Sequence, residues 1–569
     1  MTEVQQLGEL YFEQGIYFFE LSNYSLALNM WKKCFDLYQK EDEIIDILER
    51  CFIFPNLFEL KNNYKKQSEK LQIITSKVLP KYEELTLEVI FVQEDIWYIL
   101  DKFEKKLYGP INISKEYYQK NTKFYCNDEY TDIIMKDNGF LSCIEILVSV
   151  EGRTVYNIVE RLEEWCSILK IPNIISEYFT NMVIVDSLEM LFEYFHKNTQ
   201  VYLPHGEVFF QEEEKSYIKK NLEEEHAYRI SKEGRNENNI LLSICIPSYN
   251  RGTIALQNVM ELLKMPYDSE IEIIVSNNGS IYDKEGYREI ASQEDGRIIY
   301  FEFEENQHLV GNFWKVIELA KGKYIMILSD EDRLVWTALP HYFKLMKNNP
   351  QLGVIRGNNL SPSGSNSYAS LDAIYAEKGE DALNSYFLTG NYISGIIYKT
   401  EMLTDEFIFA FNKANKDNLC FYLYPHMCLD LVMLLNYDFC KDDVVLFING
   451  EAVKNEKAID WEIDKKINYP KYSSFENRIL QHYDWIKLLN QIDMRDKAKI
   501  ILYRRVCEKL FFTVSIMKML YKNEWDNICI QLAEVCVKGY DKLEINNDFK
   551  NFMQDVFIHN IILFYKSYS

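Results

Sequence analysis

Four short apolar segments follow one another within 90 residues, and their spacing constrains the fold more than any other feature of the chain. The segments are rich in Ile, Val, Leu and Phe, and they cover residues 242–247, 271–275, 298–303 and 324–328. Helical patterns separate them, the clearest at 252–264 and 309–320. Apolar runs of this length are typical of strands buried on both faces of a parallel sheet. The alternation therefore predicts an open α/β sheet, in which ligands bind at the carboxyl ends of the strands.

Polar residues follow the last of these segments in an unusual form, because Asp330, Glu331 and Asp332 are consecutive. If the strand continues through them, alternation places Asp330 and Asp332 on one side and Glu331 on the other. Carboxylates this close need a cation or hydrogen-bond donors to compensate their repulsion. One or two carboxylates completed by substrate phosphates is the usual way in which Mg²⁺ or Mn²⁺ is held. The alternative is an acidic surface turn that caps a following helix.

The polar segments occur in the order found in inverting glycosyltransferases of family 2, and the chain resembles that family over about residues 241–398, with a possible extension to 449. The matching segments are Ile246-Pro247-Ser248-Tyr249-Asn250-Arg251, Ile274-Val275-Ser276-Asn277-Asn278-Gly279-Ser280, Asn306, Gly311-Asn312, Ala320-Lys321-Gly322-Lys323-Tyr324 and Leu328-Ser329-Asp330-Glu331-Asp332. The resemblance implies an α/β domain of the GT-A nucleotide-diphospho-sugar transferase fold, with a mainly parallel sheet flanked by helices.

The resemblance also implies roles for individual residues. Those implied to bind the nucleotide sugar are Pro247, Ser248, Tyr249, Asn250, Arg251, Asn277, Asn278, Asn312, Asp330 and Glu331. Asp332, together with Asp330, is implied to hold Mn²⁺ or Mg²⁺, which stabilises the leaving nucleoside diphosphate. Asn277 departs from the family, which usually has an aspartate there. Its amide oxygen can accept a hydrogen bond from uracil N3–H, but without charge assistance.

The resemblance also implies a base that deprotonates the acceptor hydroxyl. It is expected after Asp332 in the chain, at the start of a helix. Residues 391–398 resemble the glycine-containing strand that precedes it, but the usual Glu-Asp pair does not follow. The candidate catalytic residues are His426, whose reference pKa suits proton transfer, and Asp430, which lies one helical turn further on. A structural histidine is the alternative, and Asp381 and Asp405 are further candidates.

The remaining chain carries no motif with obvious chemistry. Its predicted organisation is a helical, tetratricopeptide-like segment at 1–84, a small α/β domain at 85–212, a charged helix and linker at 213–238, the transferase domain at 239–450 and a helical region at 451–569. In the first segment, aromatic and small residues such as Gly15, Ala27 and Trp31 fall at repeat positions. A generic helical hairpin is the alternative there. In the second, strands are predicted at 87–92, 144–150 and 182–185, with helices at 155–169 and 188–196.

Composition excludes several classes of function. The net charge of −24 over 569 residues makes the chain a poor candidate for binding nucleic acid over a broad surface. No signal peptide is visible, and no apolar stretch approaches the roughly 20 residues that a transmembrane helix needs. The 12 cysteines include no C-x-x-C pair and no spacing that indicates a zinc site. We therefore predict a soluble, cytoplasmic protein with reduced thiols.

The predicted reaction is transfer of a hexose or N-acetylhexosamine from a nucleotide sugar, predicted to be UDP-linked, to a hydroxyl with inversion. The predicted partners are the nucleotide-sugar donor and an acceptor protein or glycan. One hypothesis is O-glycosylation of Ser or Thr in a protein such as flagellin. A surface polysaccharide or lipid-linked glycan is the alternative acceptor. A non-catalytic scaffold with a decayed transferase domain is an alternative of another class.

Overall fold

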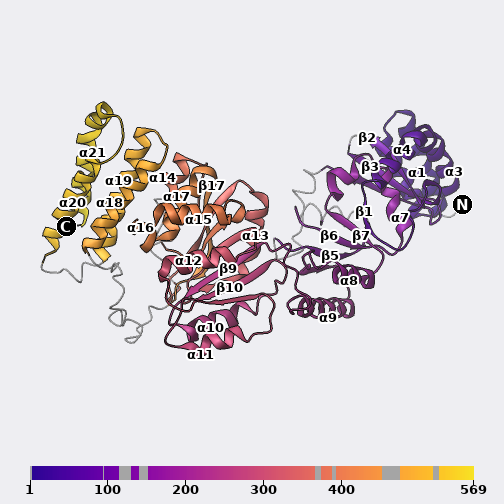
Figure 1. The fold of residues 1–569 in the computed structure, drawn as a ribbon. Helices are drawn as coiled ribbons and strands as arrows, with labels where there is room; N and C mark the ends of the chain where they lie inside the picture. The colour runs from indigo at the N-terminus through magenta and orange to yellow at the C-terminus, as the bar shows by residue number, and fades with distance from the viewer. Residues whose placement is uncertain are drawn as a thin grey trace. The chain divides into compact units, whose positions relative to one another are not determined.

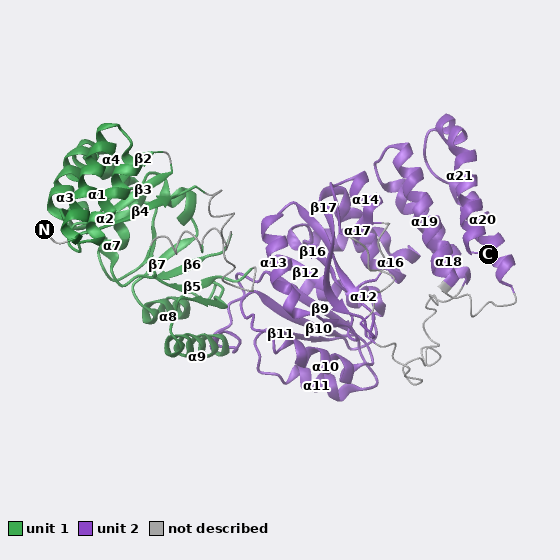
Figure 2. Cartoon of the chain, turned by 180° about the vertical axis from the view of Figure 1, so that it is seen from behind, with its two compact units in different colours: residues 1–227 green, residues 228–569 purple. Residues whose placement is uncertain are grey.

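The chain divides into two compact units, residues 1–227 and 228–569 (Figure 2). The computed structural model describes residues 3–93, 95–114, 130–139, 146, 152–364, 373–386, 392–450, 475–516 and 524–568.

The first unit begins with helices, which are α1 (Glu3–Glu20), α2 (Tyr24–Asp36), α3 (Glu41–Leu48), η1 (Glu49–Ile53), η2 (Phe54–Asn56) and α4 (Leu57–Ser68) (Figure 1). α1 and α2 form a hairpin in which Gly15 lies against Trp31; a Cβ at Gly15 would stand 2.1 Å from the indole Nε1. The Asn23 side chain caps α2 by accepting from Leu26 N–H. The predicted N-terminal helices are confirmed, while their tetratricopeptide interpretation stays a prediction.

Two sheets follow in this unit. An antiparallel sheet has the order β2-β3-β4, from β2 (Leu87–Gln93), β3 (Ile96–Asp101) and β4 (Lys106–Asn112). A parallel sheet has the order β1-β7-β6-β5-β8, from β1 (Gln72–Ile74), β5 (Ile133–Lys136), β6 (Val155–Ile158), β7 (Met182–Val185) and β8 (Gly206–Val208). The helices of this part are η3 (Tyr82–Glu84), α7 (Leu162–Cys166), η4 (Ser167–Lys170), η5 (Ile175–Phe179), α8 (Leu188–Lys197) and α9 (Glu212–Arg229).

One predicted helix in this unit is wrong. Residues 155–169 begin with strand β6, which is buried on both faces between β5 and β7, and become helical only at Leu162. A strand buried on both faces lacks polar alternation, so its sequence does not differ from that of a buried helix. The predicted strand at 144–150 lies outside the described residues except for Ile146.

The second unit contains the predicted α/β sheet. Its strand order is β11-β10-β9-β12-β16-β14-β17-β13, with β15 paired to β17. The strands are β9 (Leu242–Ser248), β10 (Ile271–Asn277), β11 (Ile298–Glu302), β12 (Tyr324–Ile327), β13 (Arg333–Leu334), β14 (Leu352–Leu360), β15 (Ile374–Ala376), β16 (Ile396–Lys399) and β17 (Asp438–Ile448). β11, β10, β9 and β12 are parallel, and β16 runs antiparallel to β12. The four predicted strands and the mainly parallel GT-A-like fold are confirmed.

Helices cover this sheet (Figure 1). They are α10 (Gly252–Leu262), α11 (Lys284–Ala291), α12 (His308–Leu319), η6 (Trp336–Ala338), α13 (Leu339–Asn348), α14 (Glu380–Tyr386), η7 (Thr400–Met402), α15 (Asp405–Asn415), α16 (Leu419–Leu423) and α17 (Pro425–Asn436). α10 and α11 approach closely, since a Cβ at Gly252 would stand 2.0 Å from the Asp283 carbonyl oxygen. Only glycine at position 252 therefore allows the two helices to pack this closely. The helices begin beside the loops that follow β9 and β10.

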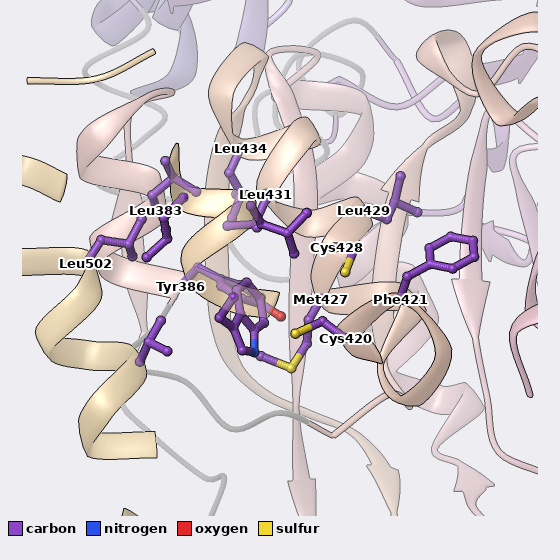
Figure 3. Close-up of a cluster of buried hydrophobic side chains, with 14 of the residues drawn as sticks. Leu383, Tyr386, Cys420, Phe421, Met427, Cys428, Leu429, Leu431, Leu434 and Leu502 are labelled. Atoms are coloured by element: carbon purple, nitrogen blue, oxygen red, sulfur yellow. The ribbon is translucent and has the colours of Figure 1, made fainter. Parts of the chain in front are cut away.

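The predicted C-terminal helices are α18 (Phe475–Gln491), α19 (Asp496–Ile516), α20 (Trp525–Asp541) and α21 (Asn547–Tyr568). They belong to the same hydrophobic cluster as the transferase sheet. Figure 3 shows part of this cluster, where Leu383 and Tyr386 of α14, Met427 of α17 and Leu502 of α19 lie close together. Burying one such side chain contributes about 1.5–3 kcal/mol. The C-terminal helices therefore stabilise the transferase domain and share its core.

Candidate active site

The three consecutive acids form a turn at the carboxyl end of β12. The strand ends at Ile327, and the Asp332 N–H donates to the Ser329 carbonyl oxygen over 3.1 Å. Strand alternation therefore does not govern the directions of these side chains, because its condition, a strand that continues through the acids, is not met. Instead the turn buries both aspartates, with Asp330 4% and Asp332 0% exposed. Buried carboxylates need specific partners.

Asp330 has a partner for each carboxylate oxygen. Its Oδ2 accepts from the Ser248 hydroxyl over 2.5 Å, and its Oδ1 accepts from Arg251 Nη1 over 3.0 Å. The same Arg251 nitrogen contacts Glu331 Oε2 at 2.7 Å. Burial raises the pKa of Asp330, the neighbouring Glu331 adds to this, and the Arg251 guanidinium opposes it. Arg251 thus joins two acids of the turn to the loop after β9.

Asp332 has a partner for only one of its oxygens. Its Oδ1 accepts from the Gly450 N–H over 2.8 Å and from the Tyr392 hydroxyl over 3.1 Å. Its Oδ2 is buried and has no hydrogen-bond partner among the residues that the structure describes. Burial raises the pKa of Asp332 to about 6, against the effect of Ser394 and the Gly450 N–H. A buried carboxylate oxygen without a donor is a suitable ligand for a hard cation.

The loops after β9 and β10 are tied together beside the acidic turn. Asn250 Oδ1 accepts from the N–H groups of Ile281 and Tyr282 at 2.9 and 3.0 Å. Asn312 Nδ2 donates to the carbonyl oxygens at the ends of both strands, those of Ser248 and Ser276. One network therefore contains six of the predicted nucleotide residues, which are Ser248, Asn250, Arg251, Asn312, Asp330 and Glu331. Pro247 at the end of β9 and Tyr249 just after it are half-buried.

Asn277 and Asn278 lie at the end of β10 with their amides engaged. Asn277 Oδ1 accepts from the Ser280 N–H over 3.1 Å, and its Nδ2 donates to the Tyr300 hydroxyl over 3.2 Å. Asn278 accepts from the Gln307 N–H and donates to Asn306 Oδ1. Asn278 therefore fixes the loop before α12. A role of either amide in reading a nucleotide base stays a prediction.

The two candidate bases belong to one helix of the transferase domain. His426 and Asp430 lie on α17 and are 2% and 0% exposed. Burial raises the pKa of Asp430 to about 6, against the effect of Arg356 and the hydroxyls of Tyr386 and Tyr398. Their role as the base stays a prediction.

The two further candidates lie on α14 and α15. Asp381 lines a polar pocket beside Tyr375 and Glu377, and Asp405 opens α15.

Three residues that support the turn were missed by sequence reasoning. Asn258 on α10 donates from Nδ2 to the backbone oxygens of Asp332, at 2.8 Å, and Asp330, at 3.4 Å. Tyr392 and Gly450 hold Asp332 Oδ1, as described above. Tyr392 falls within the glycine-containing strand segment, but nothing in the pattern singles it out. Asn258 interrupts the apolar face of its helix, and this is the one signal that the sequence offers.

Comparison with known proteins agrees with this architecture. Residues 243–405 match the family model described as Glycosyl transferase family 2. This segment, which carries β9, β10, β12 and the acidic turn, is therefore a family 2 glycosyltransferase domain with a GT-A-like fold.

Individual relatives are distant. The chain is 30% identical over 101 residues to the "Putative colanic acid biosynthesis glycosyl transferase WcaA" of Escherichia coli (strain K12), which is 18% of this chain and 35% of that protein. The match thus spans about a third of the curated relative. Among solved structures, S. aureus TarS 1-349 in complex with UDP-GlcNAc is 14% identical with a TM-score of 0.39, covering 58% of this chain and 91% of that one. The mannosyltransferase PcManGT from Pyrobaculum calidifontis in complex with GDP-Man and Mn²⁺ is 12% identical with a TM-score of 0.31, covering 57% and 86%.

Within the described part of the chain, no helix combines the length and the apolar character that crossing a bilayer requires.

Proposed function

We propose that the chain transfers a hexose or N-acetylhexosamine from a UDP-linked sugar to an acceptor hydroxyl, with inversion at the anomeric carbon. The observation that supports this most is the buried acidic turn of a family 2 domain, in which Asp332 keeps one carboxylate oxygen without a partner. Burying a carboxylate oxygen without a partner is energetically unfavourable, and a domain that had lost catalysis would gain nothing from it. This favours catalysis over the non-catalytic scaffold.

At the donor end, Arg251 is the residue best suited to meet the diphosphate. Its guanidinium is partly exposed and is held by Asp330 and Glu331. A guanidinium offers several donors in one plane, which suits phosphate oxygens. Ser248 and Asn312 fix the ends of β9 and β10, where the ribose and base are expected. Asn277 would accept from uracil N3–H through its second lone pair.

Asp332 fits Mn²⁺ or Mg²⁺, because its Oδ2 is a hard oxygen ligand left without a donor. Asp330 fits less well, since Ser248 and Arg251 hold both of its oxygens. When bound, the cation would supply positive charge to the leaving diphosphate. Tyr392 and the Gly450 N–H orient the Asp332 carboxylate through its other oxygen.

For the acceptor, we favour a Ser or Thr hydroxyl on a protein such as flagellin. The support is the separate N-terminal unit, a helical hairpin and two sheets without motifs for chemistry, which suits the binding of a partner. The Escherichia coli relative named for colanic acid biosynthesis supports the alternative, a surface polysaccharide or lipid-linked glycan.

Calorimetric titration of UDP, GDP and dTDP into the full chain tests the donor site, first with Mn²⁺ and then with EDTA. We expect UDP alone to bind, and only with Mn²⁺. Asp332→Asn should abolish the metal dependence. Glu318→Gln, which removes an exposed carboxylate paired with Lys315 on α12, is the matched control and should bind as the wild type does. Absence of binding by all three nucleotides would contradict the proposal.

Radiolabelled UDP-sugars identify the acceptor class. Incubation with cell lysate should label a protein band that protease removes and that alkaline β-elimination releases. Label in protease-resistant or lipid-extractable material would support the glycan acceptor instead. Asp332→Ala should abolish the labelling. A scaffold would show no labelling, with partner binding that survives this substitution.

A further inference from the structure

Three helices of the C-terminal region bring together a histidine and two cysteines. His482 lies on α18, Cys507 on α19 and Cys536 on α20. All three side chains are buried, and one potential ligand atom from each lies within 4.8 Å of the other two. This cluster is separate from the acidic turn and plays no part in the proposed transfer reaction.

The hydrogen bonds around His482 define its tautomer. The Tyr503 hydroxyl donates to the Cys536 carbonyl oxygen over 2.8 Å, so its single proton is used. His482 Nε2 lies 2.8 Å from the same hydroxyl oxygen and must therefore be the donor in that contact. Nε2 then carries the proton, and Nδ1 presents a lone pair. Nδ1 is buried and makes no hydrogen bond within the described residues. An imidazole whose second nitrogen is fixed by a donated hydrogen bond is the usual form of a metal-binding histidine.

Both thiols are buried, so bulk water does not solvate them. A divalent cation bound by two thiolates and a neutral imidazole would make the site electrically neutral, which suits a buried position.

We propose that His482 Nδ1, Cys507 Sγ and Cys536 Sγ bind a thiophilic d¹⁰ cation, Zn²⁺ in preference to Cu⁺, and that this ion joins α18, α19 and α20. Two sulfurs and one imidazole nitrogen are ligands that these ions prefer. Zn–S bonds of about 2.3 Å and Zn–N bonds of about 2.0 Å place tetrahedral ligands roughly 3.5–3.8 Å apart. The ligand atoms reach this spacing if the pairs at the present limit of 4.8 Å approach by at most about 1.3 Å. A non-protein ligand such as water completes a four-coordinate zinc site.

Elemental analysis of the full chain, purified without chelator, tests the proposal. We expect about one equivalent of zinc or copper per chain. Replacement by Co²⁺ should give the near-ultraviolet thiolate-to-cobalt absorption, which reports sulfur ligation in the wild-type protein. Removal of the ion should lower the melting temperature, and zinc or cuprous ion should restore it. Metal well below one equivalent after growth with added zinc and copper, together with a cobalt spectrum that lacks the sulfur band, would overturn the proposal.

Variants locate the ion. Cys507→Ser and Cys536→Ser should each lose the bound metal and the cobalt–sulfur band. Cys529→Ser is the matched control, because Cys529 is also buried on α20 but lies outside the cluster, and it should keep both. If the serine variants fail to fold, the wild-type metal content and cobalt spectrum decide the question. Equal metal content in Cys507→Ser and the wild type, or a disulfide between Cys507 and Cys536 in the freshly purified chain, would refute the site.

Discussion

The Tyr392 hydroxyl donates a hydrogen bond to Asp332 Oδ1 over 3.1 Å. Its ring stacks on Phe447, with centroids 5.9 Å apart and planes inclined by 8°, so packing fixes the direction of the hydroxyl. Burial and the adjacent Asp332 raise the pKa of Tyr392 above its ordinary value, and the group therefore remains a donor at neutral pH. Tyr392 thus orients the carboxylate whose other oxygen is proposed to bind the metal.

Tyr392→Phe removes this donor and keeps the ring stack. We expect Mn²⁺ affinity or turnover to fall by roughly 10- to 100-fold, the usual effect of removing a group that orients a metal ligand. The measurement is the Mn²⁺ dependence of UDP-sugar turnover. Tyr375→Phe is the control, since its hydroxyl donates to Asp438 at an exposed position. An unchanged Mn²⁺ titration in Tyr392→Phe would show that the hydrogen bond does not orient the site.

Arg251→Gln tests the proposed contact with the diphosphate. The guanidinium contacts Asp330 and Glu331 at 3.0 and 2.7 Å. Loss of a charged hydrogen-bond donor should weaken UDP binding by roughly 10- to 100-fold. Calorimetry with Mn²⁺ measures this effect. Arg288→Gln removes an exposed ion pair with Glu285 and should bind UDP normally. UDP affinity equal to that of the wild type in Arg251→Gln would contradict a contact between this arginine and the diphosphate.

The sequence predicted the part of the site that depends on local pattern. β9 was expected at 242–247 and runs from Leu242 to Ser248, and the acids lie at the end of β12 as expected. Apolar runs and the polar residues that follow them are contiguous in the chain. Strand burial therefore leaves a signal that can be recognised in the sequence.

The missed residues depend on contacts that leave no local pattern. Asn258, Tyr392 and Gly450 lie 74, 60 and 118 residues from Asp332 in the chain. Each is defined by one hydrogen bond across the fold, and hydrogen-bond partners at such separations have no spacing rule. The two cysteines of the proposed metal site could not be predicted from the sequence for the same reason. Cys507 and Cys536 lie on different helices, so a search for metal-binding spacing finds nothing, although helix packing brings them together.

Asn258→Ala tests whether α10 holds the acidic turn. Its Nδ2 donates to the backbone oxygens of Asp332 and Asp330, which would lose this buried donor. We expect the free energy of unfolding to fall by about 1–3 kcal/mol and metal-dependent UDP binding to weaken with it. Urea unfolding and calorimetry measure the two effects. Asn436→Ala removes an exposed amide that donates to the Val432 carbonyl oxygen, and it should change neither. A loss of stability with unaltered UDP affinity would confine Asn258 to a structural role.

Asp430→Asn should change how stability depends on pH. Asp430 is fully buried, and burial raises its pKa from 3.8 to about 6, while Arg356 and the hydroxyls of Tyr386 and Tyr398 oppose the rise. Lys509, also buried beside it, is a further opposing charge. Because the folded pKa lies above the unfolded one, the folded protein binds more protons between about pH 4 and 6. The wild type therefore loses stability as the pH rises through that window.

Asparagine does not titrate, so the stability of Asp430→Asn relative to the wild type should increase from pH 4 to pH 6 by up to about 3 kcal/mol, since one pKa unit corresponds to 1.36 kcal/mol. Urea unfolding at pH 4.5 and pH 7 measures this difference, and a constant difference would contradict it. The same variant tests the predicted base. If Asp430 deprotonates the acceptor, kcat should fall by roughly 10²- to 10⁴-fold and the acidic limb of its pH profile should disappear. If its role is confined to the core, only the stability profile changes, because a carboxylate with no exposed surface cannot meet an acceptor hydroxyl without a rearrangement of α17.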